Sequence, residues 1–209
     1  METSMDSKTK ILESSINVFA KKGMHGARME DIGKVADINK AMVYYYYSSK
    51  ENLFQEALNM IVKRIYTRII SGLRDVHGRT DDPVEIIEEF ARLHFQEYSR
   101  NRDWTRLLMD VLSDDPGKIE TAFKNAFSNG EIQEHDIIEQ SFKEGVRQGI
   151  FRDVDFTQVF ISIVGMNLIY FLARPIAETI LNNQIKNEDQ FLHDRENSIV
   201  GLLLYGIKN

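Results

Sequence analysis

The sequence of 209 residues contains no cysteine, which excludes disulfide bridges, thiolate metal ligands and cysteine nucleophiles. The first ten residues lack the apolar core of a secretory signal. No uninterrupted apolar run approaches the roughly 20 residues that span a bilayer. These absences favour a soluble protein of the reducing cytoplasm that makes no contact with a membrane.

The sequence also lacks any strand signal, internal repeat or low-complexity tract. Hydrophobic residues make up 43% of the chain, enough for one large domain or two small ones with a substantial core. Apolar residues recur at intervals of three and four along most of the chain. The predicted fold class is therefore all-α.

An excess of positive charge is absent too, since the formal net charge is −6. A protein that binds nucleic acid gains much of its affinity from basic residues that neutralise phosphates. The charge is unevenly distributed: residues 1–50 carry eight Lys and Arg against six Asp and Glu, and residues 51–209 carry 18 against 26. Only the smaller N-terminal part thus has the sign that suits DNA.

Neither a metal site nor a catalytic constellation converges in the sequence. Helical di-iron proteins use a Glu-x-x-His pattern, and none of the five histidines has a glutamate three residues before it. Pairs such as Glu89 with His94 and His135 with Glu139 are scattered. We therefore expect no metal, no cofactor and no enzymatic activity.

The N-terminal 50 residues predict three helices and a tight turn. The first runs from about 7 to 22 and ends at Gly23, and the second covers 29–36 with Ile32, Val35 and Ala36 facing inward. Residues 37–39 form the turn. A third helix covers 40–47 and is capped by Asn39.

A fourth helix follows directly, opened by a capping box of Ser48 and Glu51 and running to about residue 75. This helix connects the two predicted domains, an N-terminal domain of residues 1–50 and a larger helical domain of residues 51–209.

Successive residues of the third helix are separated by about 100°. With Val43 and Tyr47 on the inward face, the outward face consists of Ala41, Met42, Tyr44 and Tyr45, and Tyr46 lies at the boundary. A small alanine allows close approach of a partner, and tyrosine hydroxyls can donate to phosphate. Lys40 lies at the positive end of the helix dipole, an unfavourable place for a cation that suggests an anionic partner.

The larger domain predicts further helices. Asp82 and Pro83 open one that runs to about 100, and shorter pieces follow at 104–112 and from 115 to 148. That last piece is interrupted near 129–130 and stopped by Gly149. A helix over 156–181, capped by Asp155 with Gln158 and kinked or restarted at Pro175, is apolar on nearly every face, which predicts burial on more than one side. The last helix covers 188–206.

Two short helices joined by a three-residue turn and packed on a preceding helix form a helix-turn-helix, whose second helix lies in the major groove. Residues 19–54, FAKKGMHGARMEDIGKVADINKAMVYYYYSSKENLF, closely resemble the DNA-binding head of the tetracycline-repressor-like (TetR) family. The features that match are Phe19, Gly23, Asp31, Ile32, Ala36, Lys40, Val43, Tyr44, Tyr45, Tyr47, Ser49, Lys50 and Leu53.

The resemblance implies a homodimer that reads a palindromic double-stranded operator and answers to a small-molecule effector. It also implies which residues occupy the DNA-contact positions: Arg28, Asn39, Lys40, Ala41, Met42, Tyr44, Tyr45, Tyr46 and Lys50. Four residues depart from the family pattern, namely Ala27, Gly33, Asp37 and Ala41. They affect the operator sequence and the stability of the head more than the function.

Several side chains of the larger domain are candidates for lining a largely apolar effector pocket: His94, Trp104, Phe123, Phe127, Phe142, Met166, Tyr170 and Arg174. Aromatic residues at helical spacing are usually plain core, and His94 could instead pair with a nearby polar group. Arg174 could anchor an acidic ligand, form an ion pair at the dimer interface or extend along an apolar surface. The two apolar C-terminal helices offer more hydrophobic surface than one core needs, which suggests a self-complementary dimer interface.

The predicted function is a dimeric, ligand-responsive transcriptional repressor. Two alternatives stay open at this point. One is a helical enzyme or ligand carrier, and the other is a regulator that acts through a protein partner without binding an operator.

Overall fold

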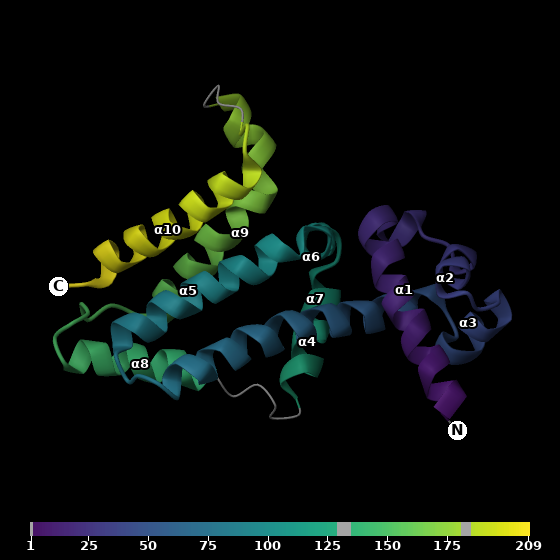
Figure 1. Cartoon of the computed structure of the whole chain (residues 1–209), viewed down its shortest axis with the longest axis horizontal. Helices are drawn as coiled ribbons and strands as arrows, with labels where there is room; N and C mark the ends of the chain where they lie inside the picture. The colour runs from purple at the N-terminus through teal and green to yellow at the C-terminus, as the bar shows by residue number, and fades with distance from the viewer. Residues whose placement is uncertain (1, 129–134, 181–184) are drawn as a thin grey trace. The chain divides into compact units, whose positions relative to one another are not determined.

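The computed structural model describes residues 2–128, 135–180 and 185–209, and within them every named element is an α-helix (Figure 1). The helices are α1 (Glu2–Gly26), α2 (Met29–Ala36), α3 (Lys40–Tyr47), α4 (Lys50–His77), α5 (Pro83–Arg100), α6 (Arg102–Asp114), α7 (Pro116–Phe127), α8 (His135–Arg147), α9 (Phe156–Ile180) and α10 (Glu188–Ile207). One isolated antiparallel bridge joins Phe151 to Lys208. The predicted all-α class is confirmed. The predicted interruption near residues 129–130 lies outside the described residues.

The chain divides into two compact units, of which the first comprises Met1–Arg64 with Asp103–Glu131 and the second Ile65–Arg102 with Ile132–Asn209. The first unit therefore contains the predicted DNA-binding domain, the first half of α4, and α6 with α7. The domain boundary expected at residue 50 remains a prediction.

In the first unit, α1 packs on α2 and α2 on α3. The ring of Phe19 meets that of Phe54 edge-on at 4.8 Å between centroids, and both side chains are fully buried. Gly23, with φ of 66°, interrupts the helical backbone of α1 where the sequence predicts its end. A left-handed backbone conformation of this kind favours glycine. Together these helices form the small core that supports α3.

The predicted inward position of Val35 is wrong, because 57% of this side chain is exposed. The buried positions of α2 are Met29, Ile32, Gly33 and Ala36. These positions follow the spacing of three and four that defines one helical stripe, and residue 35 falls outside it. Gly33 takes the inward place because a Cβ there would lie 2.7 Å from the carbonyl oxygen of Ile38.

The predicted cap of α4 is shifted by one residue. Ser49, not Ser48, accepts a hydrogen bond through Oγ from the backbone N–H of Asn52, at 3.1 Å. Ser48 has φ of 61° and ends α3, its N–H donating to the carbonyl of Tyr44. A serine cannot both terminate one helix in this conformation and cap the next from an extended one. The connection between α3 and α4 is therefore only two residues long.

In the second unit, α5 contacts α8, α9 and α10 and is the central helix (Figure 1). It begins as predicted, with the carboxylate of Asp82 accepting from the N–H of Val84 at 2.9 Å and Pro83 at the first helical position. Arg92 ties α5 to α10, since its guanidinium donates to Glu196 at 3.2 Å. The core of this unit thus lies around a single helix.

Helix α9 contradicts the expectation of burial on more than one side. Its buried residues are Val159, Ile163, Asn167 and Tyr170, which form a single stripe. Large apolar side chains on its other faces are exposed: Ile161, Ile169, Leu172, Ile176 and Ile180. Among the described residues, α9 packs mainly on α5 and α10, and its first residue, Phe156, also meets the ring of Phe142 on α8. The rest of its apolar surface stays uncovered.

Among the described residues, α9 is also the one helix whose length and apolar composition would suit a bilayer span. A core helix of a soluble protein passes the same test. The cap predicted for α9 is confirmed, since the N–H of Gln158 donates to Asp155 at 3.0 Å. Pro175 lies inside the helix, which continues to Ile180.

Candidate nucleic-acid interface

The turn between α2 and α3 has the geometry of a helix-turn-helix. Asp37 adopts a left-handed conformation, with φ of 55° and ψ of 44°. The N–H of Ile38 donates to the carbonyl of Gly33 at 2.9 Å, and the N–H of Asp37 donates to Lys34 at 3.3 Å. This pair of bonds is the Schellman motif, which satisfies the last carbonyls of α2. Asn39 then caps α3 as predicted, its Oδ1 accepting from the N–H of Met42 at 2.9 Å.

The four consecutive tyrosines of α3 separate into inner and outer positions as the angular prediction requires. Tyr47 is 3% exposed, Tyr44 is 43% exposed and Tyr45 is 76% exposed. The Tyr47 hydroxyl donates to the backbone carbonyl of Lys8 at 2.9 Å, and burial raises the pKa of Tyr47 to about 12. Tyr46 is half-buried, and its ring meets that of Tyr45 edge-on at 5.2 Å. Helix α3 is therefore anchored on one side and presents tyrosine on the other.

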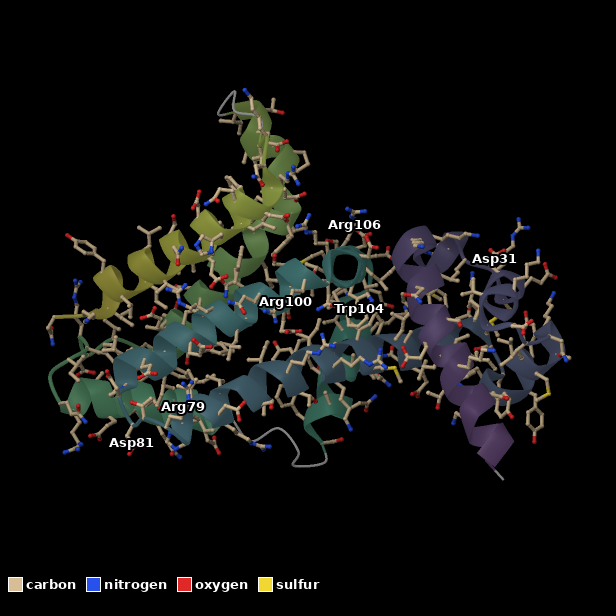
Figure 2. All side chains as sticks on the ribbon, in the orientation of Figure 1. Asp31, Arg79, Asp81, Arg100, Trp104 and Arg106 are labelled. Atoms are coloured by element: carbon tan, nitrogen blue, oxygen red, sulfur yellow. The ribbon has the colours of Figure 1, made fainter. Side chains whose placement is uncertain are left out.

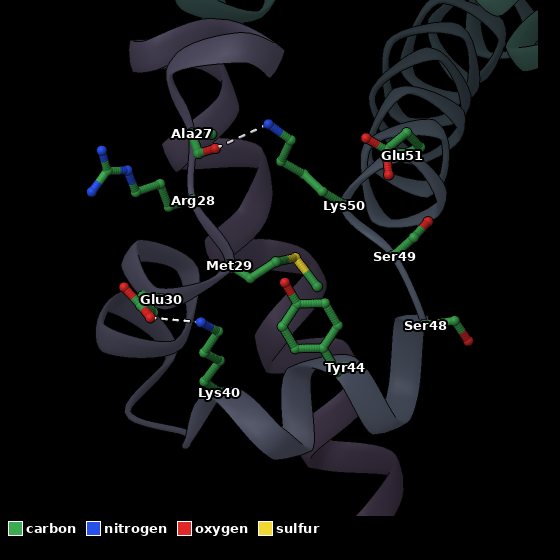
Figure 3. A pocket seen from close by; sticks show the side chains of 10 residues that line it. All are labelled: Ala27, Arg28, Met29, Glu30, Lys40, Tyr44, Ser48, Ser49, Lys50 and Glu51. Atoms are coloured by element: carbon green, nitrogen blue, oxygen red, sulfur yellow. Dashed lines mark hydrogen bonds and ion pairs between the residues drawn. The ribbon is translucent and has the colours of Figure 1, made fainter.

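A hollow of about 430 Å³ opens beside α3, and ten residues line it: Ala27, Arg28, Met29, Glu30, Lys40, Tyr44, Ser48, Ser49, Lys50 and Glu51. Figure 3 shows the ring of Tyr44 close to the end of the Met29 side chain, and the side chain of Arg28 pointing away from the other side chains. Four of the predicted contact residues thus line this one hollow on the surface: Arg28, Lys40, Tyr44 and Lys50. The hollow brings together side chains from α2, α3 and the start of α4.

Models of two known protein families match the chain. Residues 11–57 match the model described as bacterial regulatory proteins, tetR family, and residues 83–202 match that of the tetracyclin repressor-like C-terminal domain. The second match alone covers more than half of the chain.

The chain belongs to the TetR family.

Curated relatives within this family include two repressors. The chain is 31% identical over 98 residues to the HTH-type transcriptional repressor NicS of Pseudomonas putida. The aligned residues make up 47% of the chain and 44% of NicS. It is 37% identical over 51 residues to the biofilm operon regulator IcaR of Staphylococcus epidermidis, 24% of the chain and 28% of IcaR. The matched part therefore spans less than half the length of these relatives.

Solved structures of the TetR type share the fold along almost the whole chain. The ketosteroid transcriptional regulator KstR2 of Mycobacterium tuberculosis has a TM-score of 0.66 at 18% identity, over 97% of this chain and 95% of KstR2. HlyIIR, a hemolysin II transcriptional regulator, has a TM-score of 0.62 at 17% identity, over 99% of both chains. At such identities the likeness concerns the fold alone.

One predicted contact residue of this TetR-family protein, Lys40, has an anionic partner within the chain. The ammonium of Lys40 lies 2.6 Å from Oε1 of Glu30 and 6.0 Å from the centre of the Tyr44 ring. The hydrogen bond from Lys40 lowers the pKa of Glu30, and the same bond raises the pKa of Lys40. Glu30 thus pairs with Lys40 within the chain, a contact that sequence reasoning missed, and the anionic binding partner expected for Lys40 stays a prediction.

A second lysine is paired in the same manner. Lys22, at the end of α1, donates to Oδ2 of Asp31 at 2.7 Å and thereby lowers the pKa of the Asp31 carboxyl. Asp31 lies in the first turn of α2 (Figure 2). Both acidic residues that favour the start of α2 are therefore neutralised by lysines from neighbouring helices.

The remaining basic candidates differ in their surroundings. Lys50 donates to the backbone carbonyl of Ala27 at 3.3 Å, which holds its ammonium over the start of α2 (Figure 3). Arg28 is exposed and occupies the cap position of α2, where its side chain makes no capping hydrogen bond. The first N–H groups of α2 therefore have no side-chain acceptor at that position. Ala27, which stands where a capping threonine is common, is buried and supplies none.

The effector-pocket candidates fall into both units. Trp104, Phe123 and Phe127 belong to the first unit, where Trp104 lies 6.0 Å from the guanidinium of Arg64 and the two phenylalanine rings stack at 6.0 Å (Figure 2 marks Trp104). The other five belong to the second unit: His94, Phe142, Met166, Tyr170 and Arg174.

Within the second unit these side chains have different surroundings. Phe142 is fully buried and stacks on Phe151 at 5.4 Å, which is a core position. Arg174 forms ion pairs within the chain, with Glu178 at 3.1 Å and with Glu188. The ion pair expected at the dimer interface stays a prediction. Met166 lines a groove of about 250 Å³ between α9 and α10.

His94 is buried and contacts a residue that the sequence reading overlooked. Asn167 is completely buried and its Nδ2 lies 3.0 Å from Nδ1 of His94. The sequence does contain a sign of Asn167, because its amide stands alone in the middle of an otherwise apolar helical segment. Among the described residues, no three potential metal-binding side chains come together.

Proposed function

We propose that this protein is a ligand-responsive transcriptional repressor that binds a palindromic operator as a homodimer in the cytoplasm. The observation that carries the proposal is the outer face of α3, where Tyr44 and Tyr45 stand exposed on a helix fixed from behind by Val43 and Tyr47. An exposed aromatic pair on a short, well-anchored helix has no role in the core. Tyrosine offers a hydroxyl to phosphate and ring surface to base edges in the major groove.

The start of α2 supports the same proposal. Its N–H groups lack a side-chain cap, and the N-terminus of a helix attracts anions through these groups and through the helix dipole. Lys50 and Arg28 lie beside it. A DNA phosphate placed there would meet backbone N–H groups and two cations, while α3 enters the groove next to it.

The uncovered apolar surface of α9 supports the dimer. Exposed Ile169, Leu172 and Ile176 on α9, with Leu202 and Tyr205 on α10, form apolar surfaces larger than one chain covers. A two-fold interface buries the same patch on both partners, which makes such a surface self-complementary. The two heads must then lie one helical turn of DNA apart, about 34–36 Å, and an effector in the larger domain would select a conformation with a different spacing.

Removal of a single hydroxyl or ammonium from the interface should weaken operator binding broadly. We expect Tyr44→Phe and Lys50→Ala each to weaken it about tenfold or more, because a hydrogen bond to a charged phosphate contributes about 1.5–3 kcal/mol. Lys50→Ala should also lower the slope of log K against log salt by about 0.9 for each of the two heads. Gel-shift titrations at several salt concentrations, on an operator selected from random DNA, measure both effects.

Lys143→Ala provides the matched control, because it removes one lysine from α8 of the larger domain. Its affinity and salt slope should equal those of the unchanged protein. Unchanged affinity for both Tyr44→Phe and Lys50→Ala would contradict the assignment of the interface. Failure of the selection to return a palindrome would favour a regulator that acts through a protein partner.

The pairing of Lys40 with Glu30 leads to a further prediction. Glu30 holds the lysine and adds negative charge beside the DNA, so Glu30→Gln should tighten operator binding several-fold and steepen its salt dependence. Glu85→Gln, an equal loss of charge on α5, serves as the control for net charge. Weaker binding by Glu30→Gln would show that the carboxylate positions Lys40 for DNA instead of competing with it.

A further inference from the structure

Three polar atoms in the second unit are buried without a hydrogen-bond partner among the residues that the structure describes. They are Nε2 of His94, Oδ1 of Asn167 and the hydroxyl of Tyr170. Asn167 and Tyr170 lie one turn apart on the buried stripe of α9, and His94 of α5 faces Asn167. Buried polar groups almost always have partners, because leaving one unpaired is costly. Three such atoms, two on one stripe of α9 and one facing it, point to a molecule that supplies the missing partners.

The hydrogen bonds that are present fix which group is a donor and which is an acceptor. Nδ2 of Asn167 donates to the backbone carbonyl of Ala91 at 3.1 Å, a group that can only accept, so the amide orientation is determined. The same Nδ2 faces Nδ1 of His94 at 3.0 Å, so Nδ1 accepts and the proton of the neutral ring lies on Nε2. His94 therefore offers an unused donor, and Asn167 an unused acceptor.

The charge state of the site follows from its burial. His94 is 1% exposed, and desolvation lowers its pKa to about 3, so the ring is uncharged at neutral pH. Two arginines of this region are already engaged. Arg174 pairs with two carboxylates, and Arg195 of α10 donates to the carbonyl of Met166 at 3.1 Å. The three polar side chains of the site, His94, Asn167 and Tyr170, thus offer no positive charge to an anionic ligand.

The surroundings of the three atoms are mainly aromatic. The His94 ring lies 4.8 Å from the ring of Tyr98 and 5.8 Å from that of Phe90, which in turn stacks on Phe160 at 5.7 Å. The Tyr170 ring lies 5.2 Å from that of Phe191 on α10. An apolar or aromatic body suits these neighbours, and a polar group on it suits the three unpaired atoms.

We propose that His94, Asn167 and Tyr170 form the polar end of the effector site, and that they take an uncharged ligand with an aromatic or apolar body and a carboxamide or hydroxyl group. A carboxamide fits best, because its carbonyl accepts from Nε2 of His94 while its N–H donates to Oδ1 of Asn167. Tyr170 completes the site with a hydroxyl that can donate or accept. This inference rests on the proposed function and names the class of ligand that the regulator senses.

Thermal unfolding with three small probes of one shape tests the inference. Benzamide carries both the acceptor and the donor, toluene carries neither, and benzoate carries a charge. At roughly tenfold excess over its dissociation constant, benzamide should raise the Tm by about 3–6 °C. Toluene should give a clearly smaller shift and benzoate none. Equal shifts with toluene and benzamide, or a shift with benzoate alone, would overturn the assignment.

A double variant separates binding from folding. His94→Leu with Asn167→Leu replaces both partners of the His94–Asn167 hydrogen bond, together with their unpaired atoms, by apolar groups of similar size, which is nearly neutral for stability, so the fold should be retained. The benzamide shift should disappear in this variant. Ser162→Ala removes a hydroxyl from an exposed position of the same helix and should leave the shift intact. A benzamide shift that persists in the double variant would contradict the proposal.

Operator binding, measured on the same preparations, distinguishes a failure of the proposed function from a failure of the proposed ligand site. If no palindromic operator is bound, the proposed function fails whatever the probes do. If the operator is bound but none of the probes shifts the Tm, the ligand site is wrong while the regulator stands. A crystal structure with benzamide that shows only a water molecule between His94 and Asn167 would overturn the site in the same way.

Discussion

Gly145→Ala should lower the free energy of unfolding by about 1–2 kcal/mol and the Tm by about 3–8 °C. A Cβ at this position of α8 would lie 2.2 Å from the ring of Phe151, which is 1% exposed and stacks on Phe142. Neither the backbone nor the ring of Phe151 can easily move away, because its backbone N–H donates to the carbonyl of Gly145 at 3.0 Å and its buried ring is packed against Phe142. Overpacking of about 1–3 kcal/mol thus outweighs the gain of about 1 kcal/mol that alanine gives a helix.

The cause can be isolated with a double-mutant cycle. On a Phe151→Ala background the ring is absent, so adding Gly145→Ala should cost nothing and should stabilise by up to about 1 kcal/mol. Urea unfolding followed by circular dichroism gives all four free energies. An equal loss on both backgrounds would show that the glycine is required for some other reason than the Phe151 ring.

Acid should destabilise the second unit through His94. Because burial lowers the pKa of His94 from 6.5 to about 3, the unfolded chain binds a proton over this range that the folded chain does not. The stability is therefore full above pH 6.5 and falls as the pH drops towards 3. Each pH unit costs about 1.4 kcal/mol, so roughly 2–3 kcal/mol is lost between pH 6.5 and 4.5.

Denaturant titrations across this pH range measure the slope, and His94→Leu supplies the comparison. Between pH 6.5 and 4.5 the free energy of unfolding of His94→Leu should fall by about 2–3 kcal/mol less than that of the unchanged protein. His193→Leu removes an exposed histidine of α10 and should decline as the unchanged protein does. A His94→Leu profile parallel to that of the unchanged protein would mean that His94 is protonated in the folded state or not buried there.

Local signals made much of the DNA-binding surface predictable. Asn39 was identified as a cap from its residue type before a helical pattern, and its Oδ1 does accept from Met42. The inner and outer tyrosines of α3 followed from the helical angle alone. Cap positions and helical faces depend on the nearest few residues, so the sequence holds the information they need.

Partnerships between distant residues were not predictable in this way. The sequence places Lys40 at the start of α3 but does not show that Glu30, ten residues earlier, pairs with it. Asn167 meets His94 across 73 residues, and periodicity gave no sign of the contact. Such pairs depend on how helices cross, which is settled by the packing of many side chains at once.

By itself the sequence determined the all-α class, most helix boundaries, the helix-turn-helix and its outward tyrosines, because periodicity, caps and turns are local properties of the chain. Only the tertiary structure decided that Val35 faces solvent, that α9 leaves much of its apolar surface uncovered, and that polar atoms of His94, Asn167 and Tyr170 are buried without a partner among the described residues. Exposure and hydrogen-bond pairing are properties of what a residue packs against, and the folded neighbours alone fix them.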